Sequence, residues 1–158
     1  MRAFSVSSRF SGRLATMMSV LAVSAMRIMP AQASDVFMLP IDKAMTMQDA
    51  STRLDGTVKF YFGDTSHPMP LHDFGEFVSN RKTDGFAKSD MSACSWALLS
   101  ALLEFQKRAH ALGANAVINI HSYYKKEDVS NNTEIPCYKG FIVAGLAIRG
   151  DIVTVADH

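Results

Sequence analysis

The most regular pattern of apolar positions in the chain lies between residues 90 and 112 and predicts a long helix. Apolar side chains recur there at intervals of three and four residues, which places them on one face of a helix. The members of this face are Cys94, Ala97, Leu98, Ala101, Leu102, Phe105, Ala109 and Leu112. Ser89 or Ser92 can cap the first turn by accepting a backbone N–H, and Gly113 supplies the left-handed residue that ends many helices.

The chain before this helix predicts shorter elements. Residues 36–41 are apolar but broken by a proline, which fits an edge strand or an extended segment that leads into the domain. Residues 42–54 hold at most a short helix. Residues 57–62 and 74–79 have the β-branched, aromatic and alternating composition of strands, and residues 80–88 are expected to form a polar connection.

The chain after the helix predicts two strands on either side of a charged loop at residues 125–136. Residues 116–124 alternate and indicate a half-buried strand, with the even-numbered positions from 116 to 120 on one face. Residues 138–149 are apolar at even and odd positions, which is typical of a strand covered on both faces. Gly140 and Gly145 indicate a bulge or a close backbone contact within it. Antiparallel pairing of these two strands is the simplest topology, and the whole pattern predicts an α+β fold with a small, mainly antiparallel sheet packed on one long helix.

The first 33 residues have the features of a secretory signal. Three arginines precede an apolar stretch of 13 residues, Leu14 to Met26, which is too short for a bilayer that needs ~20 residues. Residues 31–33 (Ala-Gln-Ala) match the small-x-small pattern of signal peptidase. We therefore expect cleavage after Ala33, a periplasmic location and one mature domain, residues 34–158, without an integral membrane segment. No cysteine lies near the expected cleavage site, so a lipoprotein is not expected; an uncleaved amphipathic helix is the alternative.

Loss of this signal changes the charge of the chain. The full sequence has 16 Lys and Arg residues and 15 Asp and Glu residues. The basic residues that leave with the signal are Arg2, Arg9, Arg13 and Arg27. The mature domain then keeps 12 basic and 15 acidic residues, a net charge of −3. Binding to nucleic acid depends on clustered Lys and Arg side chains, and the pairs at residues 81–82 and 125–126 belong to no larger cluster, so a nucleic-acid partner is not expected.

Cys94 and Cys137 are the two cysteines of the chain, and both lie in the expected mature domain. An even number of cysteines in an oxidising compartment favours a disulfide. Closing a loop of about 44 residues would stabilise the fold by roughly 4 kcal/mol. The alternatives are two buried free thiols, or a reactive Cys94 that His110 or His121 activates for nucleophilic catalysis. Because a disulfide removes the thiolate, we expect no catalytic residue and no enzyme.

His67, Met69 and His72 form the segment most similar to a metal site. Imidazole and thioether groups are ligands that copper accepts, and a further ligand such as Asp73 or another methionine would have to complete the set. The alternative is a surface loop stiffened by prolines, and this is the interpretation we favour because no dense ligand spacing is present. No cofactor is therefore expected, and copper or zinc is kept as a hypothesis.

Further residues carry a resemblance to known families. Cys94 near a helix start, and Pro136-Cys137-Tyr138 before an apolar strand with glycines, resemble the RcsF outer-membrane stress sensors. The segment that links helix to strand is Gly113-Ala114-Asn115-Ala116-Val117. This segment is also similar to the YbjQ-type small-domain family, for which heavy-metal binding has been suggested. The runs Phe60-Tyr61-Phe62-Gly63-Asp64, Cys94-Ser95-Trp96-Ala97 and Lys139-Gly140 are similar to exported proteobacterial proteins labelled "excinuclease ATPase subunit". The chain has no G-x-x-x-x-G-K-[ST] run to hold phosphates, so no nucleotide is expected.

The resemblance covers about residues 57–150. It implies an RcsF/YbjQ-like α+β domain in which Cys94 is bonded to Cys137. The chain departs from RcsF because it lacks a second cysteine pair, with His121 and Ser122 where one of those cysteines is expected, and because it lacks a lipid-bearing cysteine.

The function that follows from these observations is a non-enzymatic periplasmic envelope protein. It would act as a disulfide-stabilised binding or interaction domain whose partner is another envelope protein or a second copy of the chain. A soft-metal-binding periplasmic protein and a thiol-dependent enzyme are the alternatives.

Overall fold

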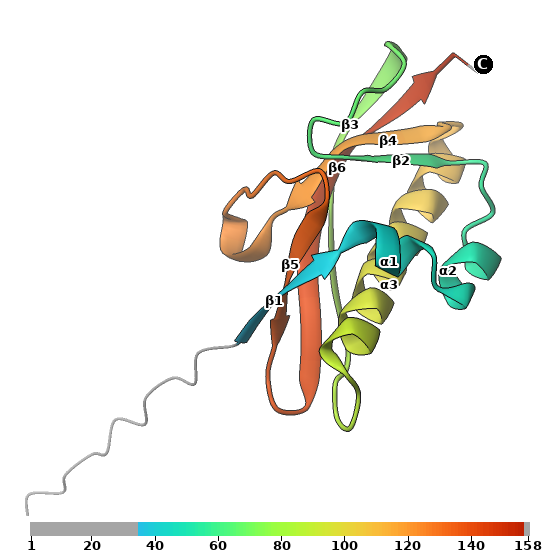
Figure 1. Cartoon of the computed structure of the whole chain (residues 1–158). Helices are drawn as coiled ribbons and strands as arrows, with labels where there is room; N and C mark the ends of the chain where they lie inside the picture. Colours follow the sequence, from blue (N-terminus) through green and yellow to red (C-terminus); the bar gives the residue numbers. More distant parts are fainter. Residues whose placement is uncertain (1–34, 157–158) are drawn as a thin grey trace, which may run out of the picture. The chain divides into compact units, whose positions relative to one another are not determined.

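A long strand, β6 (Val143–Val155), forms the centre of the sheet in the computed structural model, which describes residues 35–156 (Figure 1). Strand β3 (Pro70–Asp84) runs antiparallel to β6 along one side, from Pro70 opposite Val155 to Asp84 opposite Val143. On the other side, β5 (Glu134–Lys139) pairs with the first residues of β6, and β4 (Ala116–Ser122) pairs with its second half, both antiparallel. A single strand therefore connects nearly every part of the sheet.

Two further strands complete the six-stranded sheet. Strand β1 (Asp35–Pro40) pairs antiparallel with β5 at one edge, and β2 (Lys59–Phe62) pairs parallel with β4 at another. The α+β class and the mainly antiparallel sheet are as predicted. The described residues lie in one compact unit, whereas the predicted signal peptide, residues 1–33, lies outside the described residues.

The predicted helix is present as α3 (Asp90–Leu112). Ser89 is its N-cap and accepts a hydrogen bond of 3.2 Å from the backbone N–H of Ser92, while Gly113 ends the helix with a φ of 71°. Two short helices, α1 (Ile41–Met45) and α2 (Gln48–Arg53), precede β2, and a 3-10 turn, η1 (Tyr124–Lys126), follows β4. None of the helices in residues 35–156 has both the length and the apolar character of a membrane span.

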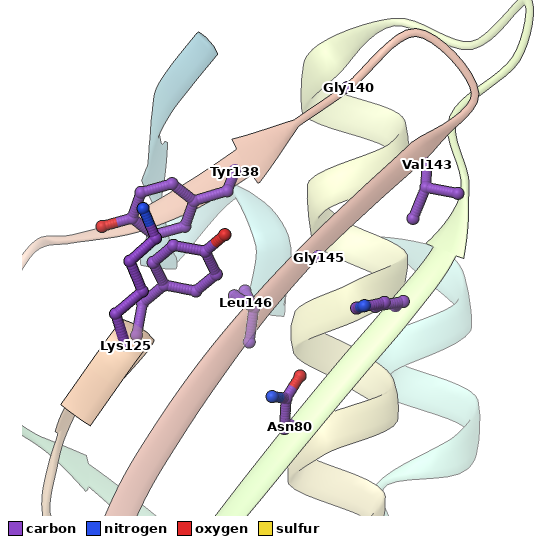
Figure 2. Close-up of a pocket in the computed structure, with 9 residues that line it drawn as sticks. Asn80, Lys125, Tyr138, Gly140, Val143, Gly145 and Leu146 are labelled. Carbon is purple, nitrogen blue, oxygen red and sulfur yellow. The ribbon is translucent and has the colours of Figure 1, made fainter. Parts of the chain in front are cut away.

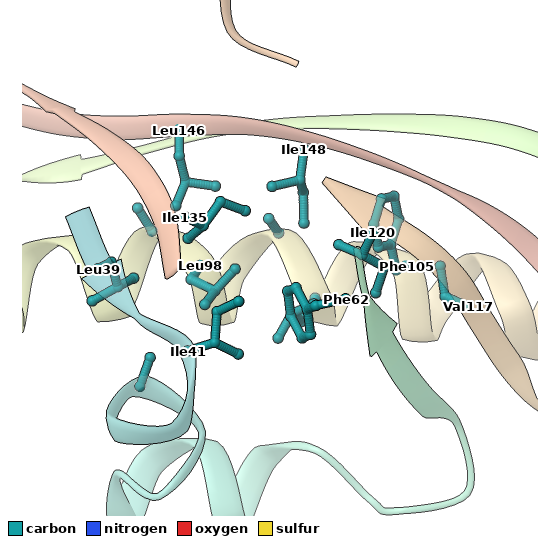
Figure 3. Packing of buried hydrophobic residues seen from close by; sticks show 14 of the residues in the cluster. Leu39, Ile41, Phe62, Leu98, Phe105, Val117, Ile120, Ile135, Leu146 and Ile148 are labelled. Atoms are coloured by element: carbon teal, nitrogen blue, oxygen red, sulfur yellow. The ribbon is translucent and has the colours of Figure 1, made fainter. Parts of the chain in front are cut away.

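The main core lies between α3 and the sheet (Figure 3). Leu98 and Phe105 of the helix meet Leu146 and Ile148 of β6, and Leu39 of β1 closes one end of the cluster. All five side chains are at most 1% exposed. Burying a side chain of this size stabilises the fold by about 1.5–3 kcal/mol, so the helix and sheet depend on each other.

The prediction of one strand over residues 138–149 is wrong. Residues 140–142 form a turn that separates β5 from β6, and the two strands pair with each other through Tyr138 and Gly145. Phe141 and Ile142, which the prediction placed in a covered strand, are 84% and 57% exposed in this turn. The sequence did not indicate this turn because turns are recognised by polar residues, glycine and proline, whereas two of its three residues are large and apolar.

The predicted strand at residues 74–79 lies within β3, but the prediction of a polar connection over residues 80–88 is wrong for residues 80–84. Strand β3 continues to Asp84, and its even-numbered residues from 76 to 84 are exposed while the odd-numbered ones are half-buried or, at Ser79, buried. The polar composition therefore belongs to the solvated face of an edge strand and not to a loop. Residues 134–136, predicted as part of a loop, likewise belong to β5.

A bulge in β4 corrects the predicted faces of that strand. Asn119 has a φ of 53°, and the pairing with β6 shifts register between Ile118 and His121. An extra residue reverses the alternation of side chains along a strand. Ile120 therefore lies in the main core beside Val117, whereas Ile118 packs in a second, smaller cluster on the other face. The strand is covered on both faces and is not half-buried.

Candidate functional site

Cys94 and Cys137 are joined by a disulfide, with the sulfur atoms 2.02 Å apart. Both residues are fully buried, and the bond connects the start of α3 to β5. Neither sulfur is a thiolate in this state, so the nucleophile considered for Cys94 is not formed. The two histidines considered as its base make other contacts.

His110 lies at the C-terminal end of α3 and faces Asp55 and Thr57. Its Nε2 atom is 2.8 Å from Thr57 Oγ1 and 3.3 Å from an Asp55 carboxylate oxygen. Hydrogen bonds from the hydroxyl and backbone N–H of Thr57, together with the nearby His110, lower the pKa of Asp55 below its usual 3.8. The three groups form an exposed polar contact between α3 and the segment before β2.

His121 belongs to a polar cluster that the sequence did not reveal. Its Nε2 atom is 2.9 Å from Asp128 Oδ1 and 2.9 Å from Arg149 Nε. Arg149 also donates to Glu76 at 3.2 Å and lies over the ring of Tyr123, 4.8 Å from its centroid. The cluster joins β3, β4, β6 and the loop after η1, and its charged groups bind one another. No spacing in the sequence indicates it, because its members come from separate elements.

The three candidate metal ligands are not gathered into one set of contacts. The His67 ring packs against Tyr61, with the ring centroids 5.7 Å apart, and the His72 ring packs against Phe74 at 4.4 Å. Met69 is 83% exposed. Within residues 35–156 no group of three or more His, Cys, Asp or Glu side chains is arranged to hold a metal ion. Nothing in this arrangement favours the copper or zinc hypothesis.

The segment from Gly113 to Val117 makes the turn from α3 into β4. Asn115 is central to this turn, because its side-chain amide donates to Val155 O at 2.9 Å and its carbonyl accepts from Val155 N at 2.8 Å. The amide side chain thereby pairs with the end of β6 as a strand residue would. Ala116 and Val117 then begin β4 with both side chains buried. Their role in the structure is architectural.

Three exposed apolar side chains meet at one end of the domain, and we name them the apolar tip: Phe86, Phe141 and Ile142. They are 60%, 84% and 57% exposed. They come from the loop between β3 and α3 and from the turn between β5 and β6, which lie side by side in Figure 1. The backbone N–H of Gly85 donates to Ile142 O at 2.9 Å, and the rings of Phe86 and Phe141 are in edge contact with centroids 6.3 Å apart. The two loops are therefore held together as one surface.

Two ion pairs lie on the segments that carry the apolar tip. Lys88 pairs with Asp84 at 3.9 Å, and Lys139 pairs with Asp90. Charged groups therefore flank the tip along the chain. Polar residues around an exposed apolar centre are typical of protein–protein contact sites.

A groove of about 440 Å³ lies next to the apolar tip, on the face of the sheet opposite α3 (Figure 2). Its lining residues include Asn80, Lys82, Tyr124, Lys125, Tyr138 and Gly145. The rings of Tyr124 and Tyr138 are stacked, with centroids 3.5 Å apart and planes inclined by 15°. Burial raises the pKa of Tyr138, and the nearby Tyr124 and Glu127 add to this effect. The phenol of Tyr138 is therefore neutral at pH 7.

A second cavity, of about 490 Å³, lies between α1 and β2. Its lining residues are Ile41, Asp42, Phe60, Phe62, Thr65, Asn132 and Thr133. Asp42 is the one charged residue in this set. The cavity carries no group that distinguishes one ligand from another.

Comparisons with protein-family models, with curated proteins and with solved structures gave no match to this chain. The class of protein is therefore the one that its own structure defines: an α+β domain with a six-stranded sheet, a buried disulfide and an exposed apolar tip. The resemblance to RcsF and YbjQ stays a prediction.

Proposed function

We propose that this chain is a non-enzymatic envelope protein that is exported to the periplasm and binds another envelope protein through its apolar tip. The single observation that carries the proposal is the exposure of Phe86, Phe141 and Ile142 on two loops that are bonded to each other. Aromatic side chains are enriched at the centres of protein interfaces, where they contribute most of the binding energy. The signal-like residues 1–33 and the buried disulfide support the periplasmic location.

Beside the tip, Lys88 and Lys139 are each paired with an aspartate. Loops that bind anionic membranes combine apolar side chains with unbalanced Lys and Arg side chains. Because Lys82 and Lys125, which form no ion pair within the described residues, line the adjacent groove, a lipid surface is the competing partner. A second copy of the chain is the other partner that the sequence suggested, and the experiment below separates these cases.

The RcsF/YbjQ-like arrangement of helix and sheet is part of the proposal. It is supported by the bond between Cys94 and Cys137 and by the turn from Gly113 into β4.

Site-specific photocrosslinking in cells tests the proposed contact. A photoreactive amino acid replaces Phe141 in one variant and the exposed Lys107 of α3 in a matched control. We expect Phe141 to capture one envelope protein that Lys107 does not capture. The captured protein, once purified, should bind the wild-type chain, and Phe86→Ser should weaken this binding at least tenfold.

Three outcomes would contradict the proposal. They are adducts with lipid alone, adducts with a second copy of the chain alone, and identical adducts from Phe141 and Lys107. Circular dichroism of Phe86→Ser should match the wild type, because the side chain is 60% exposed and lies outside the core.

A further inference from the structure

The positive charges that line the groove differ from those around it. Arg81 pairs with Glu104, and Lys88 and Lys139 pair with aspartates. Lys82 and Lys125 both line the groove, and among the described residues no carboxylate lies within 4.0 Å of either ammonium group. The groove therefore holds two lysines that form no ion pair within the described part of the chain, and an acid near its wall is Glu127, which contributes to the raised pKa of Tyr138.

These two lysines approach the groove from opposite sides. Lys82 lies on β3 beside Asn80, and Lys125 lies in η1 beside the stacked tyrosines. Figure 2 shows Lys125 and Tyr138 on one side of β6 and Asn80 on the other. An anionic group in the groove would be attracted to both ammonium groups, and the amide of Asn80 can donate a hydrogen bond to it.

The rest of the groove is suited to an apolar group. The stacked rings of Tyr124 and Tyr138 form one wall, and the turn that leads into β6 contributes Gly140 and Val143. Gly145 leaves the space next to Lys82 open, because an added Cβ at this position would lie 2.9 Å from Lys82 Cγ. The volume of about 440 Å³ lies at the small end of the range of roughly 300–1,000 Å³ that small-molecule sites occupy.

We propose that this groove is a binding site for a small anionic amphiphile, a molecule with one acidic group and a short aliphatic or aromatic body. The acidic group lies between Lys82 and Lys125, and the body lies against Tyr124 and Tyr138. The site does not depend on the proposed function, because the apolar tip can bind a protein whether or not the groove is filled.

Calorimetric titration of the purified, disulfide-intact protein tests the site with three probes of equal chain length: octanoate, octanol and octylamine. We expect octanoate to bind at least tenfold more tightly than the other two, and to bind more weakly at high salt because exposed charges are screened. Lys82→Gln combined with Lys125→Gln should weaken octanoate binding at least tenfold. Lys107→Gln, an exposed lysine on α3, is the matched control and should leave it unchanged.

Equal affinity for octanoate and octanol, an unchanged affinity in the double variant, or no heat of binding with millimolar octanoate would each overturn the proposal. Phosphatidylglycerol vesicles identify the source of the acidic group. If the protein binds these vesicles through Lys82 and Lys125 but does not bind octanoate, the anion is a lipid headgroup and the free small molecule is excluded. Thermal unfolding of the double variant should match the wild type, because both lysines are exposed.

Discussion

Reduction of the disulfide between Cys94 and Cys137 should destabilise the domain by about 4 kcal/mol. The two residues are 43 positions apart, and closing a loop of about 44 residues removes roughly 13 cal/mol/K of entropy from the unfolded chain. At 25 °C this corresponds to about 4 kcal/mol. Because domains of this kind have a total stability of only about 5–15 kcal/mol, the reduced protein should be folded but marginal.

The effect of closing the loop on the unfolded chain can be measured separately from the loss of packing contacts around the two sulfur atoms. Both cysteines are fully buried, so reduction keeps their volume in the core. The double variant Cys94→Ala/Cys137→Ala loses the bond and also the two sulfur atoms. It should therefore be less stable than the reduced wild type, by about 1 kcal/mol for each buried group removed.

Urea unfolding followed by circular dichroism measures both differences. With a slope of about 1.5 kcal/mol/M, a loss of about 4 kcal/mol lowers the midpoint by roughly 2.7 M. The wild type should show this shift when reductant is added, whereas the double variant, which has no disulfide, should give the same midpoint with and without reductant. A shift of less than about 1 kcal/mol on reduction would refute the reasoning, because the loop term would then be absent.

Three further predictions concern other parts of the domain. Gly145→Ala should destabilise it by about 1–3 kcal/mol, since the new Cβ would lie 2.9 Å from a backbone oxygen of β3; urea midpoints equal to wild type would contradict this. Because the pKa of Asp55 is lowered in the folded protein, its ionised carboxylate stabilises the fold above pH 3.8, and this stabilisation is lost as the pH falls toward the folded-state pKa. Asp55→Asn should therefore lose less stability than the wild type between pH 5 and pH 2, as measured by thermal unfolding. Metal analysis of the purified protein should find well under one equivalent of copper or zinc, and the same amount in His67→Ala/His72→Ala; one equivalent that this variant loses would restore the metal hypothesis.

The helix α3 could be predicted from the sequence because everything that defines it is local. Its apolar residues recur at helical spacing, Ser89 caps its first turn and Gly113 ends it. Each of these signals depends on residues within a few positions of one another. The even number of cysteines was similarly informative, because a chain with two cysteines offers one pairing.

The strands were predicted less well, because their limits depend on partners far away in the sequence. Strand β3 extends to Asp84 because β6 pairs with it along that whole length. The bulge at Asn119 moves Ile120 to the other face of β4, which no alternation of apolar residues indicates. The apolar turn at residues 140–142 was hidden because its side chains, although exposed, resemble those of the strands around it.

Both candidate binding surfaces were decided by the tertiary structure. The apolar tip combines Phe86 with Phe141, and the groove combines Lys82 with Lys125, so each depends on segments more than 40 residues apart. The sequence by itself determined the long helix, the α+β class, and which apolar residues were available for a core. The pairing of β6 with β3 and β5 decided which side chains of the tip and the groove are exposed. A side chain is exposed or buried according to which other segments of the chain pack against it.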